Sequence, residues 1–289
     1  MEKGKLIVVD GTDGSGKGTQ TELLVERLKS EGHVVFMLDF PQYGERSAAM
    51  VEDYLNGKFG TAEEVGPYRA SIFYACDRYA AAAEAKKRIE NGEICISNRY
   101  ASANMGHQTG NIKDKDKRDD FLEWLDDLEF GIFGIPRPDC QILVYADPAV
   151  AQALVDKKGH RDYVGGEKRD ILEADIDHLK NASEAFLYCA EKFDWSVVNC
   201  TPEGDMRSIE DIHEEIYGIV KGEIGSQGYD SGELDNVDVE EYCIGEGCGE
   251  DIEEDGREIV YSTEGMSEEE KAAKIKELEA RYGVEAVVK

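Results

Sequence analysis

This sequence of 289 residues has no long apolar run, and its cysteines follow no regular spacing. No apolar stretch approaches the roughly 18 consecutive residues of a membrane-spanning helix. The N-terminal stretch MEKGKLIVVD has four consecutive apolar residues, too few for the core of a signal peptide. The seven cysteines are an odd number and do not follow the spacing of a disulfide framework. We therefore expect a cytoplasmic protein that does not bind membranes, whose cysteines pack as small apolar side chains.

Basic residues are scarce, with 33 Lys and Arg against 63 Asp and Glu, and the formal net charge is −30. Such a chain is poorly suited to neutralising phosphates along a nucleic acid, so we expect no nucleic-acid partner. Half of this charge lies in residues 222–289, which contain 21 acidic and 6 basic residues. Together with a Gly-, Ser- and Asp-rich stretch at 222–238, the shift predicts a main domain over residues 1–221 and an acidic C-terminal extension over residues 222–289.

The extension carries few indications of its role. Ser267 followed three residues later by Glu270 has the pattern of a capping box and predicts a short helix that ends near Gly283. Cys243 and Cys248 would supply half of a zinc site, whereas all five histidines precede residue 222. We expect either a regulatory appendage or a surface that binds a protein partner, and the sequence does not decide between them.

The main domain alternates short apolar runs with longer segments of helical period, which is typical of a parallel sheet with helices on both faces. The candidate strands are residues 6–9, 34–38, 94–97, 142–145 and 196–199. The clearest helix places Ile176, Leu179 and Phe186 on one apolar face and charged residues on the other. The pattern therefore predicts a doubly wound α/β fold.

The strongest motif follows the first strand directly. GTDGSGKGTQ, residues 11–20, leads into the helical run TELLVERLKS, the strand, loop and helix context of a phosphate-binding P-loop. Its glycines let backbone N–H groups turn toward a polyphosphate, the helix N-terminus adds positive charge, and Lys17 would contact the β- and γ-phosphates. The residues expected to hold ATP are Gly11, Asp13, Gly14, Ser15, Gly16, Lys17, Gly18, Thr19 and Gln20.

The loop has a variant ending that bears on the metal and on the family. The common pattern ends in Lys followed by Ser or Thr, whereas here Gly18 intervenes and Thr19 supplies the hydroxyl expected on Mg²⁺. This ending is familiar in nucleoside monophosphate kinases. Asp13, inside the loop, lies where thymidylate kinases have an acidic residue that holds the 3′-hydroxyl of the deoxyribose.

Two further segments, taken with the loop, resemble the thymidylate kinase family. FYACDR, residues 73–78, resembles the helix segment that implies Tyr74 as the ring stacked on thymine and Arg78 as the partner of its exocyclic oxygen. SNRYASANMGHQ, residues 97–108, resembles the Asp-Arg-Tyr/His signature, whose arginine, here Arg99, binds the substrate phosphate. The substrate-binding residues that the resemblance implies are Asp13, Phe40, Arg46, Tyr74, Arg78, Arg99, Asn104 and His107.

The sequence departs from the family pattern at several of these positions. Asn98 replaces the usual Asp before the signature arginine, which leaves the magnesium ligands open. Tyr43 stands where the family has an arginine on the substrate phosphate, so Arg46 becomes the candidate for that role. His107 replaces a tyrosine near the 2′-position of the sugar and Ala103 replaces a serine, so discrimination between dTMP and dUMP or UMP is open.

Residues 156–170, the densest basic stretch, resemble the mobile lid of the family. In that family, the arginine that stabilises the transferring phosphoryl group comes from the loop position after Asp13 or from the lid. Gly14 occupies the loop position, so the resemblance implies Arg161 and Arg169 as lid candidates beside Lys17 and Arg99 in the catalytic set.

The resemblance covers residues 5–220 and implies a five-stranded sheet with strand order 2-3-1-4-5, a homodimer, and transfer of the γ-phosphoryl group from ATP to thymidine 5′-monophosphate (dTMP) with Mg²⁺. Two alternatives remain open. One is another nucleoside monophosphate kinase of the UMP or AMP type, and the other is a nucleotide-binding protein with impaired catalysis. Turnover measured with several monophosphates separates the three.

Overall fold

The computed structural model describes residues 3–155, 176–225, 250–252, 258–261 and 285–288. The chain divides into two compact units, Met1–Tyr229 and Asp230–Lys289. Within the described residues, no helix combines the length and the apolar character needed to cross a membrane. Arg161, Arg169, Cys243, Cys248 and the predicted helix that starts at Ser267 lie outside the described residues.

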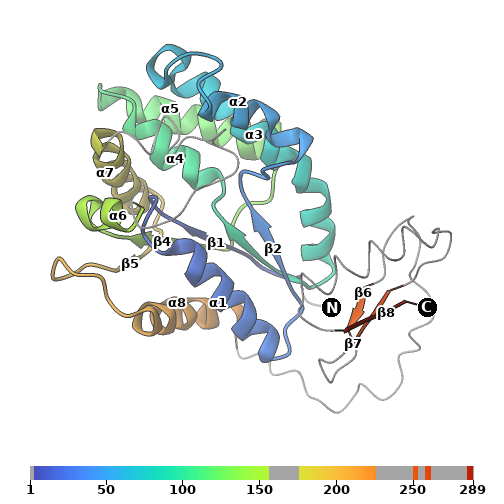
Figure 1. The fold of residues 1–289 in the computed structure, drawn as a ribbon. Coiled ribbons are helices and arrows are strands. Elements are labelled where there is room, and N and C mark those ends of the chain that lie inside the picture. The colour runs from blue at the N-terminus through green and yellow to red at the C-terminus, as the bar shows by residue number, and fades with distance from the viewer. Residues whose placement is uncertain (1–2, 156–175, 226–249, 253–257, 262–284, 289) are drawn as a thin grey trace. The chain divides into compact units, whose positions relative to one another are not determined.

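The first unit is built on a five-stranded parallel sheet (Figure 1). Its strands are β1 (Leu6–Asp10), β2 (Val35–Asp39), β3 (Ile94–Asn98), β4 (Cys140–Tyr145) and β5 (Ser196–Asn199). The order across the sheet is β2-β3-β1-β4-β5. The predicted fold class and strand order are therefore confirmed, and the predicted strands lie within two residues of the observed ones at either end.

Helices cover both faces of this sheet (Figure 1). They are α1 (Lys17–Ser30), α2 (Ala49–Leu55), α3 (Ala62–Glu90), α4 (Ala101–Gly110), α5 (Asp116–Asp126), α6 (Pro148–Val155), α7 (Ile176–Lys192) and α8 (Ile209–Ile224). Two short elements also belong to the unit, a 3-10 turn η1 (Arg46–Ala48) and a π-helical segment η2 (Asp127–Ile132).

Successive residues of β1 explain the two covered faces. Ile7 and Val9 belong to one core cluster with residues of α1 and α8, whereas Leu6 and Val8 belong to another with residues of α3. Successive side chains of a strand point to opposite faces. All five residues of β1 are buried, so the strand reads as a continuous apolar run closed by Asp10.

The packing of α4 against α7 depends on two glycines. A Cβ atom on Gly106 would lie 2.5 Å from the ring of Phe186, and one on Gly110 would lie 2.8 Å from the backbone nitrogen of Ala182. Both glycines therefore let α7 approach α4 more closely than any side chain would permit. This contact fixes the helix that carries Asn104 and His107.

The second unit contains a small three-stranded sheet. Its strands are β6 (Glu250–Ile252), β7 (Glu258–Tyr261) and β8 (Glu285–Val288), in the order β6-β7-β8. The β6–β7 pair is antiparallel and the β7–β8 pair is parallel. This sheet was not predicted from the sequence.

Candidate active site

The P-loop joins the end of β1 to the start of α1, as its motif predicts. Gly11 and Gly14 have φ angles of 153° and 82° and pack closely on neighbouring backbone. A Cβ atom would lie 2.3 Å from the carbonyl oxygen of Val144 at Gly11 and 2.1 Å from that of Ala151 at Gly14. Both positions therefore need glycine, which brings the loop backbone to the N-terminus of α1.

Lys17, the first residue of α1, is buried within the loop. Its Nζ donates to the carbonyl oxygen of Thr12 at 3.3 Å and to Oδ1 of Asp13 at 3.2 Å. Burial, followed by the nearby charge of Arg99, lowers the pKa of the Lys17 ammonium to about 8 although Asp13 and Asp10 oppose this shift. Such a buried cation is suited to receiving a polyphosphate, whose negative charge would favour its protonated form.

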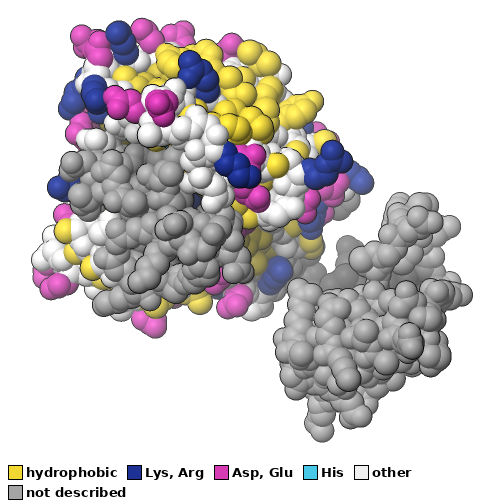
Figure 2. All heavy atoms as spheres, turned by 45° about the horizontal axis from the view of Figure 1, so that its top comes forward, with side chains coloured by type: hydrophobic (Ala, Val, Ile, Leu, Met, Phe, Trp, Pro, Cys, Tyr) yellow, Lys and Arg dark blue, Asp and Glu magenta, His cyan; other side chains and the backbone are white. Residues whose placement is uncertain are grey.

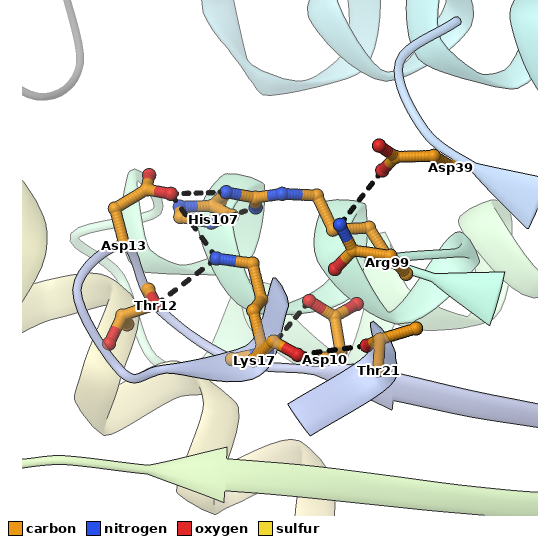
Figure 3. Close-up of polar contacts among 10 residues, drawn as sticks. Asp10, Thr12, Asp13, Lys17, Thr21, Asp39, Arg99 and His107 are labelled. Atoms are coloured by element: carbon orange, nitrogen blue, oxygen red, sulfur yellow. Dashed lines mark hydrogen bonds and ion pairs between the residues drawn. The ribbon is translucent and has the colours of Figure 1, made fainter. Parts of the chain in front are cut away.

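Arg99 follows β3 in a left-handed backbone conformation, with φ of 64°. Its backbone N–H donates to the carbonyl oxygen of Val9 at 3.0 Å, which ties it to β1. The guanidinium then reaches back to the P-loop, where Nη2 pairs with Oδ1 of Asp13, and Nη1 lies 3.1 Å from Nε2 of His107 (Figure 3). Asp13 therefore contacts both Lys17 and Arg99.

A cleft of about 250 Å³ lies between the P-loop and the carboxyl ends of β2 and β3. Its lining residues are Asp13, Gly14, Gly16, Lys17, Gly18, Asp39, Phe40, Pro41, Tyr43, Asn98 and Arg99. The structure thus brings predicted ATP-binding residues and predicted acceptor-binding residues to one cleft. In open α/β sheets, ligands bind at the carboxyl ends of the strands.

Asp10 is the last residue of β1, directly before the P-loop, and was not predicted as a site residue from the sequence. Its Oδ1 accepts the N–H of Gly11 at 2.8 Å and its Oδ2 accepts the hydroxyl of Ser102 at 2.7 Å. Burial raises the pKa of this carboxyl, against the lowering effects of Arg99 and the two hydrogen bonds. Its position at the end of a buried strand, directly before the loop, was the signal available in the sequence.

Arg78 and Asn104, two of the residues expected around the base, come together between α3 and α4. Arg78 and Asn104 are each 2% exposed, and both contact Glu129 of η2. Tyr74 lies one helical turn before Arg78 on α3 and packs edge-on against Tyr54. Glu129 was missed because the π-helical segment that positions it has no recognisable pattern in the sequence.

A third missed residue, Asp77, holds the loop after β2. Its Oδ2 accepts the backbone N–H of Gln42 at 2.8 Å, and its Oδ1 accepts the hydroxyl of Ser47 at 2.6 Å. Through these bonds α3 fixes the segment that carries Phe40 and Tyr43 at the cleft.

Some predicted residues lie away from the described cleft lining. Arg46 is exposed on η1, and Thr19 is exposed in the first turn of α1. Gln20 donates from Nε2 to the carbonyl oxygen of Ile209 at 2.9 Å, which ties α1 to α8. Phe40 lines the cleft but is 4% exposed and packs on Tyr100. The ligand contacts expected of Arg46, Thr19 and Gln20 therefore stay predictions.

Comparison with known proteins agrees with this geometry. The sequence model of the thymidylate kinase family matches residues 9–216. Thymidylate kinase of Schizosaccharomyces pombe is 26% identical over 220 residues, which are 76% of this chain and 93% of that protein. Thymidylate kinase of Homo sapiens is 26% identical over 218 residues, covering 74% of this chain and 88% of that protein.

A solved structure extends the comparison to the fold. Thymidylate kinase from Candida albicans superposes with a TM-score of 0.59 at 18% identity, covering 76% of this chain and 92% of that chain. The family match spans the P-loop, the segments expected to bind the base, and Arg99. The chain therefore belongs to the thymidylate kinase family.

Proposed function

We propose that this chain transfers the γ-phosphoryl group of ATP to dTMP, giving thymidine diphosphate, at the cleft between the P-loop and Arg99. The family uses ATP and acts on dTMP. The observation that carries the proposal is the position of Asp13, whose Oδ1 contacts both Lys17 and Arg99. One loop thus borders the places expected for the donor phosphates and the acceptor phosphate, as direct transfer requires.

On the donor side, the backbone of residues 11–19 binds the phosphates of ATP and Lys17 neutralises the β- and γ-oxygens. On the acceptor side, Arg99 binds the 5′-phosphate through two N–H groups. Tyr74 stacks on the base, and Arg78 and Asn104 bond its polar edge. Asp13 holds the 3′-hydroxyl, and His107 and Phe40 border the nucleotide. Transfer is in line and needs no covalent enzyme intermediate.

The residues present fit a magnesium ion bound with the nucleotide. Oδ1 of Asn98 is buried without a hydrogen-bond partner among the described residues, while Nδ2 of the same amide donates to Asp39 at 2.8 Å. Amide and carboxylate oxygens are ligands that Mg²⁺ accepts, often through water. We propose that Asp39 and Asn98 face the metal, which would neutralise the developing phosphate charge when bound. The contact of the Thr19 hydroxyl with Mg²⁺ stays a prediction, because Thr19 is not among the residues that line the cleft.

Arg161 and Arg169, in the segment that resembles the lid, lie outside the described residues. We therefore keep them as proposed catalytic residues on the resemblance alone. Their proposed role is to contact the transferring phosphoryl group. The cytoplasmic location and a protein partner for residues 222–289 likewise remain predictions.

We also propose a homodimer that forms through the exposed side of α3. Tyr68, Ile72 and Tyr79 recur at helical spacing there and are 43%, 40% and 57% exposed, with Cys76 exposed between them. Figure 2 shows hydrophobic side chains gathered on one face of the described part of the chain. An apolar patch of this kind marks an interface. Sedimentation velocity should give a dimer for the wild type and a monomer for Ile72→Lys; a monomeric wild type contradicts the proposal.

Turnover with four acceptors tests the function. The purified protein is given ATP and Mg²⁺ with dTMP, dUMP, UMP or AMP, and ADP formation is followed. We expect the highest kcat/KM with dTMP. Faster use of UMP or AMP indicates another nucleoside monophosphate kinase, and absence of ADP with every acceptor indicates a nucleotide-binding protein without catalysis.

A further inference from the structure

Arg78 and Glu129 form a buried, two-pronged ion pair between α3 and η2. Their side chains are 2% and 0% exposed. Nε of Arg78 donates to Oε1 and Oε2 of Glu129 at 3.1 and 3.0 Å, and Nη2 also donates to Oε1. The bonds between the two side chains use Nε and Nη2, so Glu129 fixes the guanidinium plane while Nη1 has no partner among the described residues.

The same carboxylate contacts Asn104 on α4. Nδ2 of Asn104 donates to the carbonyl oxygen of Ser71 at 3.1 Å and lies 3.5 Å from Oε1 of Glu129. Two acceptors thus surround the amide nitrogen. If the amide turned over, its oxygen would face a carbonyl and a carboxylate, which is unfavourable in a buried site. Oδ1 of Asn104 is therefore held as an acceptor on the other side of the amide.

We propose that Glu129 is the positioning residue that sets base specificity, because it holds Arg78 as a donor and Asn104 as an acceptor. This inference rests on the proposed function, in which these two side chains bond the base. A thymine or uracil edge offers a carbonyl oxygen beside a ring N–H and matches both groups. Cytosine offers an amino group beside an unprotonated ring nitrogen, so it opposes a donor to Arg78 and an acceptor to Asn104.

The charge of Glu129 is essential to this role. A neutral amide at position 129 could donate as well as accept, so Asn104 could turn over and present Nδ2 to the base. The guanidinium would also lose its ionic partner, although the charge of Asp77 also acts on Arg78. A site built to bond specific polar atoms rejects a mismatched ligand strongly because buried groups are then left unpaired. Without the Glu129 carboxylate, the site should therefore reject a cytosine nucleotide less strongly.

Kinetics of Glu129→Gln test the proposal against a purely structural role. We expect the KM for dTMP to rise about 10-fold or more, kcat at saturation to change by less than about 3-fold, and the ratio of kcat/KM for dTMP over dCMP to fall at least about 10-fold. Asp126→Asn is the matched control, since it breaks the exposed Asp126–Arg137 pair three residues earlier and should leave this ratio unchanged.

The outcomes are distinguishable. A Glu129→Gln variant with the wild-type ratio overturns the inference, even if its melting temperature falls, because Glu129 would then only hold η2 to α3. A wild-type protein that does not prefer dTMP overturns the proposed function and the inference with it.

A second variant covers the case in which Glu129→Gln does not fold. Arg78→Gln/Glu129→Gln removes both charges and leaves no lone buried ion. The change in melting temperature with saturating dTMP or dCMP then reports binding. We expect the wild type to be stabilised by dTMP far more than by dCMP and the double variant to respond similarly to both. A double variant that still responds to dTMP alone overturns the inference.

Discussion

Asp13 and Arg99 lie 86 residues apart in the sequence and are joined by an ion pair across the cleft. The oxygen that binds Arg99 also accepts from Lys17 at 3.2 Å. One carboxylate oxygen therefore neutralises two cations that are expected to bind different nucleotides. We expect incoming phosphates to compete with Asp13 for both cations, so that Asp13 would set how strongly each site attracts its substrate.

Asp13→Asn should weaken the binding of dTMP. The variant loses the carboxylate that orients Arg99 and that is expected to hold the 3′-hydroxyl, so we expect kcat/KM for dTMP to fall about 100-fold, on the order of 3 kcal/mol. Steady-state kinetics check this. Asp53→Asn, which breaks an exposed pair with Lys58, is the control and should be neutral. An unchanged KM for dTMP contradicts this role of Asp13.

Arg99→Lys should reduce activity more than its conserved charge suggests. Lysine keeps one positive charge but cannot contact Asp13, His107 and a phosphate through one planar group. We expect kcat/KM for dTMP to fall about 100-fold or more with a smaller effect on the KM for ATP. Arg27→Lys is the control, because Arg27 lies at the contact of α1 with α8 and does not line the cleft. Equal losses for both nucleotides would show that Arg99 does not serve the acceptor alone.

The pKa of Lys17 predicts proton uptake when ATP binds. Burial lowers this pKa to about 8, and the triphosphate should raise it again. At pH 8, ATP binding should therefore take up about half a proton, and at pH 6.5 almost none. Isothermal titration calorimetry in two buffers with different ionisation enthalpies measures this uptake, and Lys17→Met should abolish it. Equal apparent enthalpies in the two buffers at pH 8 contradict the prediction.

The same pKa gives a stability prediction for the protein without nucleotide. In the unfolded chain Lys17 titrates at its ordinary pKa of 10.5, whereas in the fold it titrates at about 8. The unfolded state thus binds more protons between these values, so the Lys17 contribution to stability rises as the pH increases from about 8 to 10.5. The free energy of unfolding of the wild type, compared with that of Lys17→Met, should therefore increase between about pH 8 and pH 10.5, as measured by chemical denaturation.

Gly106→Ala should destabilise the fold. Its Cβ atom would lie 2.5 Å from three ring atoms of the buried Phe186, so α4 and α7 must move apart. We expect a loss of about 1–3 kcal/mol, measured by chemical denaturation. Gly218→Ala on α8 is a matched control, because nothing lies within 4 Å of its added methyl group. Alanine favours a helix by about 1 kcal/mol over glycine, so this control should be neutral or stabilising.

Truncation after Tyr229 should leave turnover nearly unchanged. The boundary between the two units lies after Tyr229, and α8 extends to the buried Ile224, while Glu223 pairs with Lys5. A truncation at residue 222 would remove these contacts, so we expect it to lower stability. Activity and melting temperature of the two truncated proteins check this. Loss of activity in the longer one would show that the second unit takes part in the function.

The local motifs were predictable because each is read within a few residues. The P-loop needs a strand, spaced glycines and a lysine before a helix, and Arg99 follows directly on a strand. Long-range partners could not be read in this way. Glu129 lies 51 residues from Arg78 and sits in a π-helical segment, and Asp77 contacts a loop 30 to 35 residues earlier in the chain. The second sheet was not predicted because its short strands lie in an acidic segment and each begins with a glutamate, so their apolar runs are shorter than those that mark β1, β2 and β4 of the main domain.

Figure 3 shows Arg99 and His107 meeting beside Asp13, and His107 is preceded by Gly106 at the α4–α7 contact. Substitutions along α4 that change the size of side chains near the sugar would have to keep Gly106, because a larger residue there would contact Phe186. The ring of His107 also packs edge-on against Phe186, so the close approach of α4 and α7 restricts which side chains the fold tolerates at both positions.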